Sequence, residues 1–205
     1  FPERAAEIVS AMVRAVDKPV TAKIRAGWGH VDLTAVVVFV RKLEAAGVAA
    51  ISIHGRTRSQ AFSGRADWGV IAAVKEAVGI PVIGNGDVMS PADARKMVAD
   101  TGCDAVMVGR GAVGKPWVYN QMDAAIEGRE ISPDPPLSER LATALRHTQE
   151  CAEQMVPQRA LVQARKHLYS YASDFPGARH LRQKIDEAEN VDALIRVLSS
   201  SLDHV

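Results

Sequence analysis

Cationic, imidazole and amide side chains stand close to glycines at four places in the first half of the chain. These groups are Lys23 with Arg25, His54 with Arg56, Asn85 with Asp87, and Arg110. Lysine and arginine bind anions through charge-assisted hydrogen bonds, and glycine lets a ligand come close to the backbone. Together these residue types predict a binding site for an anionic ligand.

Two of these places have a glycine on each side of the polar residue. Gly84-Asn85-Gly86 and Gly109-Arg110-Gly111 are expected to expose backbone N–H groups, and a helix is expected to begin near Ala112. Such turns and helix N-termini bind phosphate groups. Many barrel enzymes that bind phosphorylated ligands carry turns of this kind after their last two strands.

Short apolar segments lead into each polar group and are predicted to be strands. They are Val20–Ala26, Ala49–Gly55, Pro81–Asp87 and Ala105–Gly111. Because they are apolar nearly throughout, both of their faces should be covered, as in a parallel sheet. The carboxyl ends of parallel strands meet at one edge, so the polar groups should gather there.

Helical patterns with recognisable ends separate the strands. Asp32, Asp67 and Ser90 are expected N-caps, and Ser90 is followed by proline at the first helical position. Gly47, Gly79 and Gly102 are expected to end these helices in the left-handed conformation. The chain thus repeats a βα unit four times, which predicts a parallel α/β sheet.

The polar strand ends favour a barrel over an open Rossmann sheet. A Rossmann domain would show a glycine fingerprint after its first strand and an acidic residue about 20 residues later, and the sequence has neither. We therefore expect the second half of a (β/α)₈ TIM barrel, with four earlier strands preceding Phe1. Ile24, Ile53, Ile83 and Met107, or their alternating neighbours, should form its inward face.

A proline-rich segment, residues 131–136, separates this α/β part from a tail with helical spacing only. The expected division is a half-barrel in residues 1–131 and an all-α helical bundle in residues 132–205. Between Arg159 and Lys184 the tail has six basic residues against one acidic residue. Arg159, Arg165, Lys166 and Arg182 lie in this stretch, and a solvated polar face is the usual explanation of such a charge run.

The composition excludes a strong overall charge, because 25 basic residues face 24 acidic ones. The longest apolar run is too short for a membrane helix, and no signal-peptide pattern opens the chain. Cys103 and Cys151 stand in no metal-ligand spacing, so we expect no metal. A cytoplasmic protein without a membrane partner is expected.

Four motifs in order resemble those of bacterial tRNA-dihydrouridine synthases over essentially the whole chain. Lys23-Ile24-Arg25-Ala26-Gly27-Trp28 resembles the fifth-strand motif, and Ile53-His54-Gly55-Arg56-Thr57-Arg58 resembles the sixth. Gly84-Asn85-Gly86-Asp87 is similar to the seventh. Val108-Gly109-Arg110-Gly111, with Lys115-Pro116-Trp117, is similar to the eighth.

The resemblance implies an oxidoreductase that acts on a CH–CH bond. In that family NADPH reduces FMN, and the flavin passes hydride to C6 of a uridine held in tRNA. The implied FMN-binding residues are Lys23, His54, Asn85, Gly86, Asp87, Gly109 and Arg110. The implied tRNA-binding residues are Arg56, Arg58, Arg159, Arg165, Lys166 and Arg182.

The resemblance also implies that no catalytic residue lies in this chain. The family's catalytic cysteine, which protonates C5 of the base, follows the fourth barrel strand and would precede Phe1. We therefore expect the isolated chain to be inactive, to hold FMN poorly, and to dimerise through open barrel edges, although a full-length parent should be monomeric. Two other interpretations stay open: another FMN-dependent barrel oxidoreductase of the dihydroorotate dehydrogenase kind, and a non-catalytic RNA-binding module.

Overall fold

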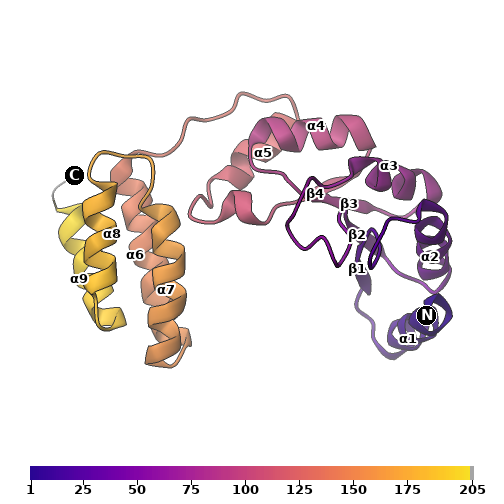
Figure 1. Cartoon of the computed structure of the whole chain (residues 1–205), viewed down its shortest axis with the longest axis horizontal. Coiled ribbons are helices and arrows are strands. Elements are labelled where there is room, and N and C mark those ends of the chain that lie inside the picture. Colours follow the sequence, from indigo (N-terminus) through magenta and orange to yellow (C-terminus); the bar gives the residue numbers. More distant parts are fainter. Residues whose placement is uncertain (204–205) are drawn as a thin grey trace. The chain divides into compact units, whose positions relative to one another are not determined.

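The computed structural model describes residues 1–203, which divide into two compact units (Figure 1). The first unit consists of Phe1–Gly111 and Asn120–Ile131, and it contains the sheet. The second consists of Ala112–Tyr119 and residues 132–203, and it is helical.

The first unit contains a parallel sheet of four strands in the order β1-β2-β3-β4. The strands are β1 (Thr21–Arg25), β2 (Ala50–His54), β3 (Val82–Asn85) and β4 (Ala105–Met107). The predicted parallel α/β sheet is therefore confirmed, with each strand shorter than its apolar segment. Among the described residues β1 pairs with β2 alone and β4 with β3 alone, so both outer strands have an unpaired edge.

Helices connect the strands, and those that follow Asp32, Asp67 and Ser90 begin where the sequence predicts. The helix expected to begin near Ala112 does not, because a short 3₁₀ helix ends at Ala112 and the next α-helix begins at Val118. The helices of the first 131 residues are α1 (Pro2–Ala15), α2 (Leu33–Ala45), α3 (Trp68–Ala77), α4 (Pro91–Thr101), the short 3₁₀ helix η1 (Arg110–Ala112) and α5 (Val118–Ile126). Asp32, Asp67 and Ser90 each accept a backbone N–H at the start of α2, α3 and α4, so all three predicted N-caps are confirmed.

The predicted helix ends are only partly correct. Gly102 caps α4 with φ +67, and Gly47 takes φ +95 one residue after the cap of α2. Gly79 is not a left-handed cap, because α3 ends at Ala77 and is followed by an extended residue. The carboxylate of Glu44 accepts the N–H groups of Gly79 and Ile80, so a contact from α2 takes the place of a local cap.

The strand register shows which face of the sheet each residue occupies. Lys23 lies level with Ser52 and Ile83, and His54 lies level with Arg25 and Asn85, so these side chains share one face. The other face carries Ile24, Ile53, Gly84 and Val106. A Cβ at Gly84 would lie 2.7 Å from Sδ of Met97 on α4, so this second face is the one that packs against the helices.

The four residues that we expected on the inward face of the barrel therefore lie on two opposite faces of the sheet. Ile83 and Met107 lie on the face of Lys23, whereas Ile24 and Ile53 lie on the helix side. Alternation along one strand gives two sets of residues, and the sequence does not show how the sets of different strands align.

Four helices of the second unit surround one hydrophobic core. They are α6 (Leu137–Gln154), α7 (Pro157–Tyr171), α8 (Ala178–Glu187) and α9 (Val191–Leu202). Leu141, Leu168, Ile185, Leu194 and Leu198 are all buried in it. Their helical spacing places one apolar stripe of each helix toward the shared core. No helix within residues 1–203 is long and apolar enough to cross a membrane.

Candidate functional site

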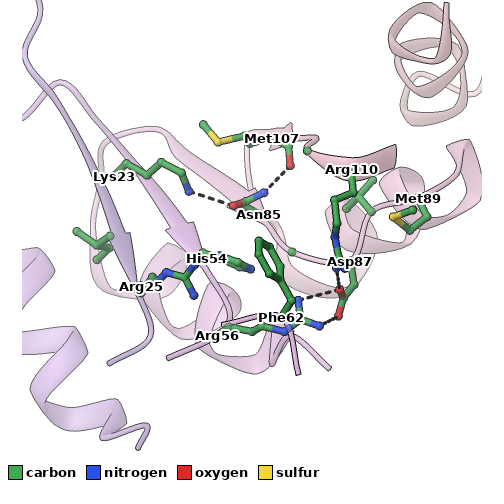
Figure 2. A pocket seen from close by; sticks show the side chains of 14 residues that line it. Lys23, Arg25, His54, Arg56, Phe62, Asn85, Asp87, Met89, Met107 and Arg110 are labelled. Atoms are coloured by element: carbon green, nitrogen blue, oxygen red, sulfur yellow. Dashed lines mark hydrogen bonds and ion pairs between the residues drawn. The ribbon is translucent and has the colours of Figure 1, made fainter. Parts of the chain in front are cut away.

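A cavity of about 610 Å³ lies at the carboxyl ends of the four strands (Figure 2). The structure brings all seven expected cofactor residues to its lining: Lys23, His54, Asn85, Gly86, Asp87, Gly109 and Arg110. They come from four successive βα units and meet because the strands are parallel and adjacent in chain order. Their role as flavin ligands stays a prediction.

A row of hydrogen bonds crosses the sheet inside this cavity. The Lys23 ammonium donates to Oδ1 of Asn85 at 3.0 Å, and Nδ2 of Asn85 donates to the Met107 carbonyl at 2.8 Å. Burial and the nearby charge of Arg25 lower the pKa of Lys23 from its ordinary value. The amide of Asn85 thus fixes a cation over the middle of the sheet and ties β1, β3 and β4 together.

His54 is buried, with 8% of its surface exposed, and it is surrounded by cations. Burial, followed by the charges of Arg25, Lys23 and Arg56, lowers the pKa of His54 to about 4. The imidazole is therefore neutral at pH 7. A neutral histidine offers one N–H donor and one acceptor, so it can bind a neutral polar edge of a ligand.

The low pKa of His54 predicts a pH dependence of stability. The unfolded chain binds a proton at His54 near pH 6.5 and the folded chain only near pH 4, so stability is lost as the pH falls through this window. We expect the free energy of unfolding to drop by up to about 3 kcal/mol between pH 6.5 and 4. In His54→Gln this part of the pH dependence should vanish in urea titrations. Identical pH profiles for the two proteins would contradict the assignment.

Two glycines at the cavity differ in what surrounds them. A Cβ at Gly86, which has φ +126, would lie 2.6 Å from Cβ of Ala66 and 3.0 Å from Cδ2 of His54. A side chain there would push against the protein itself. A Cβ at Gly109 would meet nothing within 4 Å, so the space beside its backbone is open. Open space beside a glycine suits close approach of a ligand to the backbone.

Arg56 does not occupy the position expected of an RNA-binding residue. Its side chain is 2% exposed and donates to both carboxylate oxygens of Asp87, each at 2.8 Å. It also donates to the carbonyls of Ser63 and Gly64. These four acceptor atoms hold the guanidinium inside the protein. Arg58, two residues later, is exposed as expected.

Asp87 is held in an uncommon backbone conformation, with φ +56. Burial alone would raise the pKa of its carboxyl group. The hydrogen bonds from Arg56 and the Ala66 N–H, with the charges of Arg56 and Arg110, outweigh burial and lower this pKa below its ordinary value. Asp87 therefore stays ionised at neutral pH and balances one of the cations around the cavity.

The structure adds lining residues that were not among the expected cofactor residues. Arg25 was named only as a polar group of the predicted anion site and Met107 only as a strand residue, and Phe62 and Met89 were not singled out. Phe62 lies in the segment after β2, is 63% exposed, and has the Arg110 guanidinium 4.9 Å from its ring centre. No periodicity marks that segment. An aromatic residue among glycine and serine was the one available signal.

The expected tRNA-binding residues of the second unit fall into two groups. Arg159 and Lys166 on α7 and Arg182 on α8 are exposed. Arg165 is only half-buried, and its guanidinium donates to the Ala188 carbonyl at 2.6 Å, while its Nε is buried without a partner. Arg165 therefore braces α7 against the end of α8, which does not fit a phosphate contact.

Within residues 1–203 no group of three histidine, cysteine or acidic side chains could hold a metal ion. Cys103 and Cys151 are both buried. Cys103 precedes β4, at the edge of the sheet away from the cavity, and Cys151 lies on α6. Cys103 is therefore not near the carboxyl ends of the strands, and Cys151 belongs to the second unit.

Comparison with known proteins supports one family. The sequence model of that family, described as dihydrouridine synthase, matches residues 1–203. The tRNA-dihydrouridine synthase B of Pseudomonas aeruginosa is 42% identical over 188 residues, which are 92% of this chain and 56% of that protein. The probable tRNA-dihydrouridine synthase 1 of Synechocystis is 42% identical over 190 residues, covering 93% of this chain and 53% of the relative.

A third relative, the tRNA-dihydrouridine synthase B of Xanthomonas campestris pv. campestris, is 39% identical over 198 residues. The match covers 97% of this chain and 59% of that protein. The chain thus spans somewhat more than half the length of these curated relatives.

Proposed function

Because this chain belongs to the dihydrouridine synthase family, we propose that it provides the FMN-binding and tRNA-binding parts of an oxidoreductase that reduces the C5–C6 bond of uridine in tRNA, with NADPH as the reductant. One observation carries the proposal. All seven residues expected to bind the cofactor line the same cavity, although they come from four separate βα units.

The residues of the cavity fit FMN. Its volume of about 610 Å³ lies within the range of small-ligand sites, and Lys23, Arg25 and Arg110 supply positive charge for an anionic cofactor. FMN, when bound and reduced, supplies the hydride that is added to C6 of the base. The open backbone at Gly109 and the Arg110 guanidinium would bind the phosphate group.

Lys23 and His54 would bind the ring system. The Lys23 ammonium, oriented by Asn85, would stabilise the negative charge that collects on the flavin ring when it is reduced. His54 stays neutral at pH 7 and would hydrogen-bond to the edge of the flavin or to its ribityl chain without adding charge. The chain's own groups thus bind, orient and tune the cofactor.

Two observations support a half-barrel. The sheet has four parallel strands with an unpaired edge at β1 and at β4, and a closed eight-stranded barrel leaves no edge. We therefore propose that residues 1–131 form half of a (β/α)₈ barrel and that residues 132–205 are the tRNA-binding helical part. Protonation of C5 would come from a cysteine outside this chain, because Cys103 precedes β4, away from the cavity, and Cys151 belongs to the helical second unit.

The proposal can be tested with this chain and with a chimera that joins it to the amino-terminal part of the Pseudomonas aeruginosa relative. The chimera should bind about one FMN per chain and oxidise NADPH only when unmodified tRNA is present. The isolated chain should show no tRNA-dependent oxidation, and it should dimerise in sedimentation experiments. NADPH oxidation by the chimera with orotate in place of tRNA would favour an FMN-dependent barrel oxidoreductase of the dihydroorotate dehydrogenase kind. Binding of tRNA by a chimera that takes up no flavin would favour a non-catalytic RNA-binding module.

A further inference from the structure

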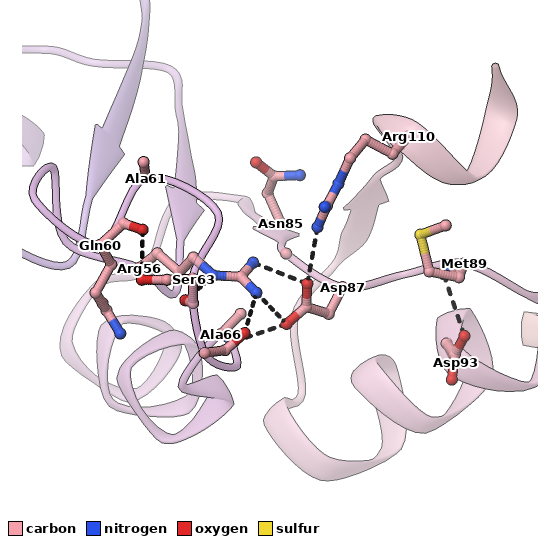
Figure 3. A network of polar contacts seen from close by, with 12 residues as sticks. Arg56, Gln60, Ala61, Ser63, Ala66, Asn85, Asp87, Met89, Asp93 and Arg110 are labelled. Carbon is pink, nitrogen blue, oxygen red and sulfur yellow. Dashed lines mark hydrogen bonds and ion pairs between the residues drawn. The ribbon is translucent and has the colours of Figure 1, made fainter.

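The buried arginine at the cavity, Arg56, connects three parts of the first unit (Figure 3). It follows β2, and its Nε and Nη2 donate to the carbonyls of Ser63 and Gly64 in the segment that leads to α3. Its two terminal nitrogens also form a fork with the carboxylate of Asp87, which follows β3. Fork pairs of this kind are among the stronger hydrogen-bonded ion pairs in proteins.

Asp87 also accepts a hydrogen bond from a second arginine, Arg110. Its Oδ1 also accepts from Nη2 of Arg110, but at 3.3 Å, which is longer than either 2.8 Å contact with Arg56. Its Oδ2 also accepts the Ala66 N–H at 2.8 Å. Arg110 is 53% exposed and lines the cavity, whereas Arg56 is buried. The two arginines thus share one carboxylate unequally.

This unequal sharing has an electrostatic consequence. Two arginines and one aspartate leave one positive charge, and the short contacts put the neutralised pair at Arg56 and Asp87. Arg110 keeps its charge toward the cavity. If Arg56 were missing, the free carboxylate would become the best partner for Arg110 and would form a fork with it instead. The cavity would then lose the cation at this end.

We propose that Arg56 is a positioning residue that occupies Asp87 and thereby leaves Arg110 available to bind a phosphate group in the cavity. Arg56 itself touches no ligand in this role. The identity of the phosphate as that of FMN rests on the proposed function, whereas the competition between the two arginines for Asp87 does not.

The test compares FMN with riboflavin, which differs from FMN only by lacking the phosphate. Both dissociation constants are measured by fluorescence quenching for the chimera described above. The value for riboflavin divided by the value for FMN is the ratio that isolates the contribution of the phosphate. Arg56→Gln should lower this ratio about tenfold, the size expected for loss of one charge-assisted hydrogen bond. The affinity for riboflavin should stay nearly unchanged.

The double variant with Arg56→Gln and Asp87→Asn distinguishes a positioning role of Arg56 from a merely structural one. The second change removes the carboxylate that captures Arg110, so the preference for FMN should return. A merely structural role for Arg56 predicts the opposite, because the double variant loses both halves of the ion pair. Arg110→Gln is the matched control and should abolish the preference whether or not Arg56 is present.

Each outcome decides the proposal. An unchanged ratio in a folded Arg56→Gln variant, or no recovery in the double variant, overturns it. If Arg56→Gln does not fold, Arg56→Lys, which keeps the charge but loses the fork, should lower the ratio in the same direction. If neither flavin binds the chimera that carries the unchanged residues, the FMN assignment fails. The same variants are then compared by isothermal titration with inorganic phosphate, where the same loss and recovery support the proposal and their absence overturns it.

Discussion

Replacing Lys23 with methionine should slow the reduction of bound flavin by NADPH about 100-fold in the chimera described above, and it should weaken FMN binding. Removal of one positioned donor to a developing negative charge costs enzymes roughly 10²–10³ in rate. The Lys23 ammonium is held by Asn85 at 3.0 Å and lines the cavity. Methionine has a similar length and no charge, so the fold should persist.

Stopped-flow measurement of flavin absorbance after mixing with NADPH gives the rate directly. Lys42→Met is the matched control, because Lys42 lies on α2, where it pairs with Glu3 on α1 and does not line the cavity. It should leave the rate and the FMN affinity unchanged. Normal reduction together with normal FMN retention in Lys23→Met would remove Lys23 from the cofactor site.

Simultaneous replacement of Arg159, Lys166 and Arg182 with alanine should weaken tRNA binding about 100-fold at physiological salt. These three side chains are exposed on α7 and α8, in the basic stretch of the second unit. Each phosphate contact contributes about 0.7–0.9 to the slope of log affinity against log salt concentration. Loss of three contacts should therefore lower that slope by about 2–3.

Filter-binding titrations with unmodified tRNA at several salt concentrations measure both quantities. Arg196→Ala on α9 is the matched control, since it removes an exposed arginine outside the basic stretch and should leave the slope unchanged. An unaltered slope in the triple variant would refute RNA binding by this surface. We do not group Arg165 with it, because its hydrogen bond to the Ala188 carbonyl gives it a structural role.

Local sequence signals were enough to predict the strands and most helix ends. Asp32, Asp67 and Ser90 cap helices through hydrogen bonds to residues two or three positions later. Their capping role therefore depends on only a few neighbouring residues. Gly102 ends α4 for a similarly local reason. Gly79 was predicted wrongly because its N–H is bound by Glu44, which is far away in the sequence.

The seven residues of the candidate cofactor site could also be predicted to lie together. Six of them end or follow a strand and Lys23 lies two residues before the end of β1, and parallel strands in chain order bring their carboxyl ends to one edge. Sequence alone therefore determined the type of sheet, the edge at which the site lies, and most of the polar groups that line it.

Only the tertiary structure decided how the charges are distributed within that site. Arg56 was expected to bind tRNA, but its side chain is buried and pairs with Asp87, and Arg110 shares the same carboxylate. The face of each strand residue was likewise decided by register, which placed Ile83 beside Lys23 and Ile53 toward the helices. Both features depend on contacts between residues far apart in the chain, and the residue types alone do not specify which arginine a shared aspartate will bind more closely.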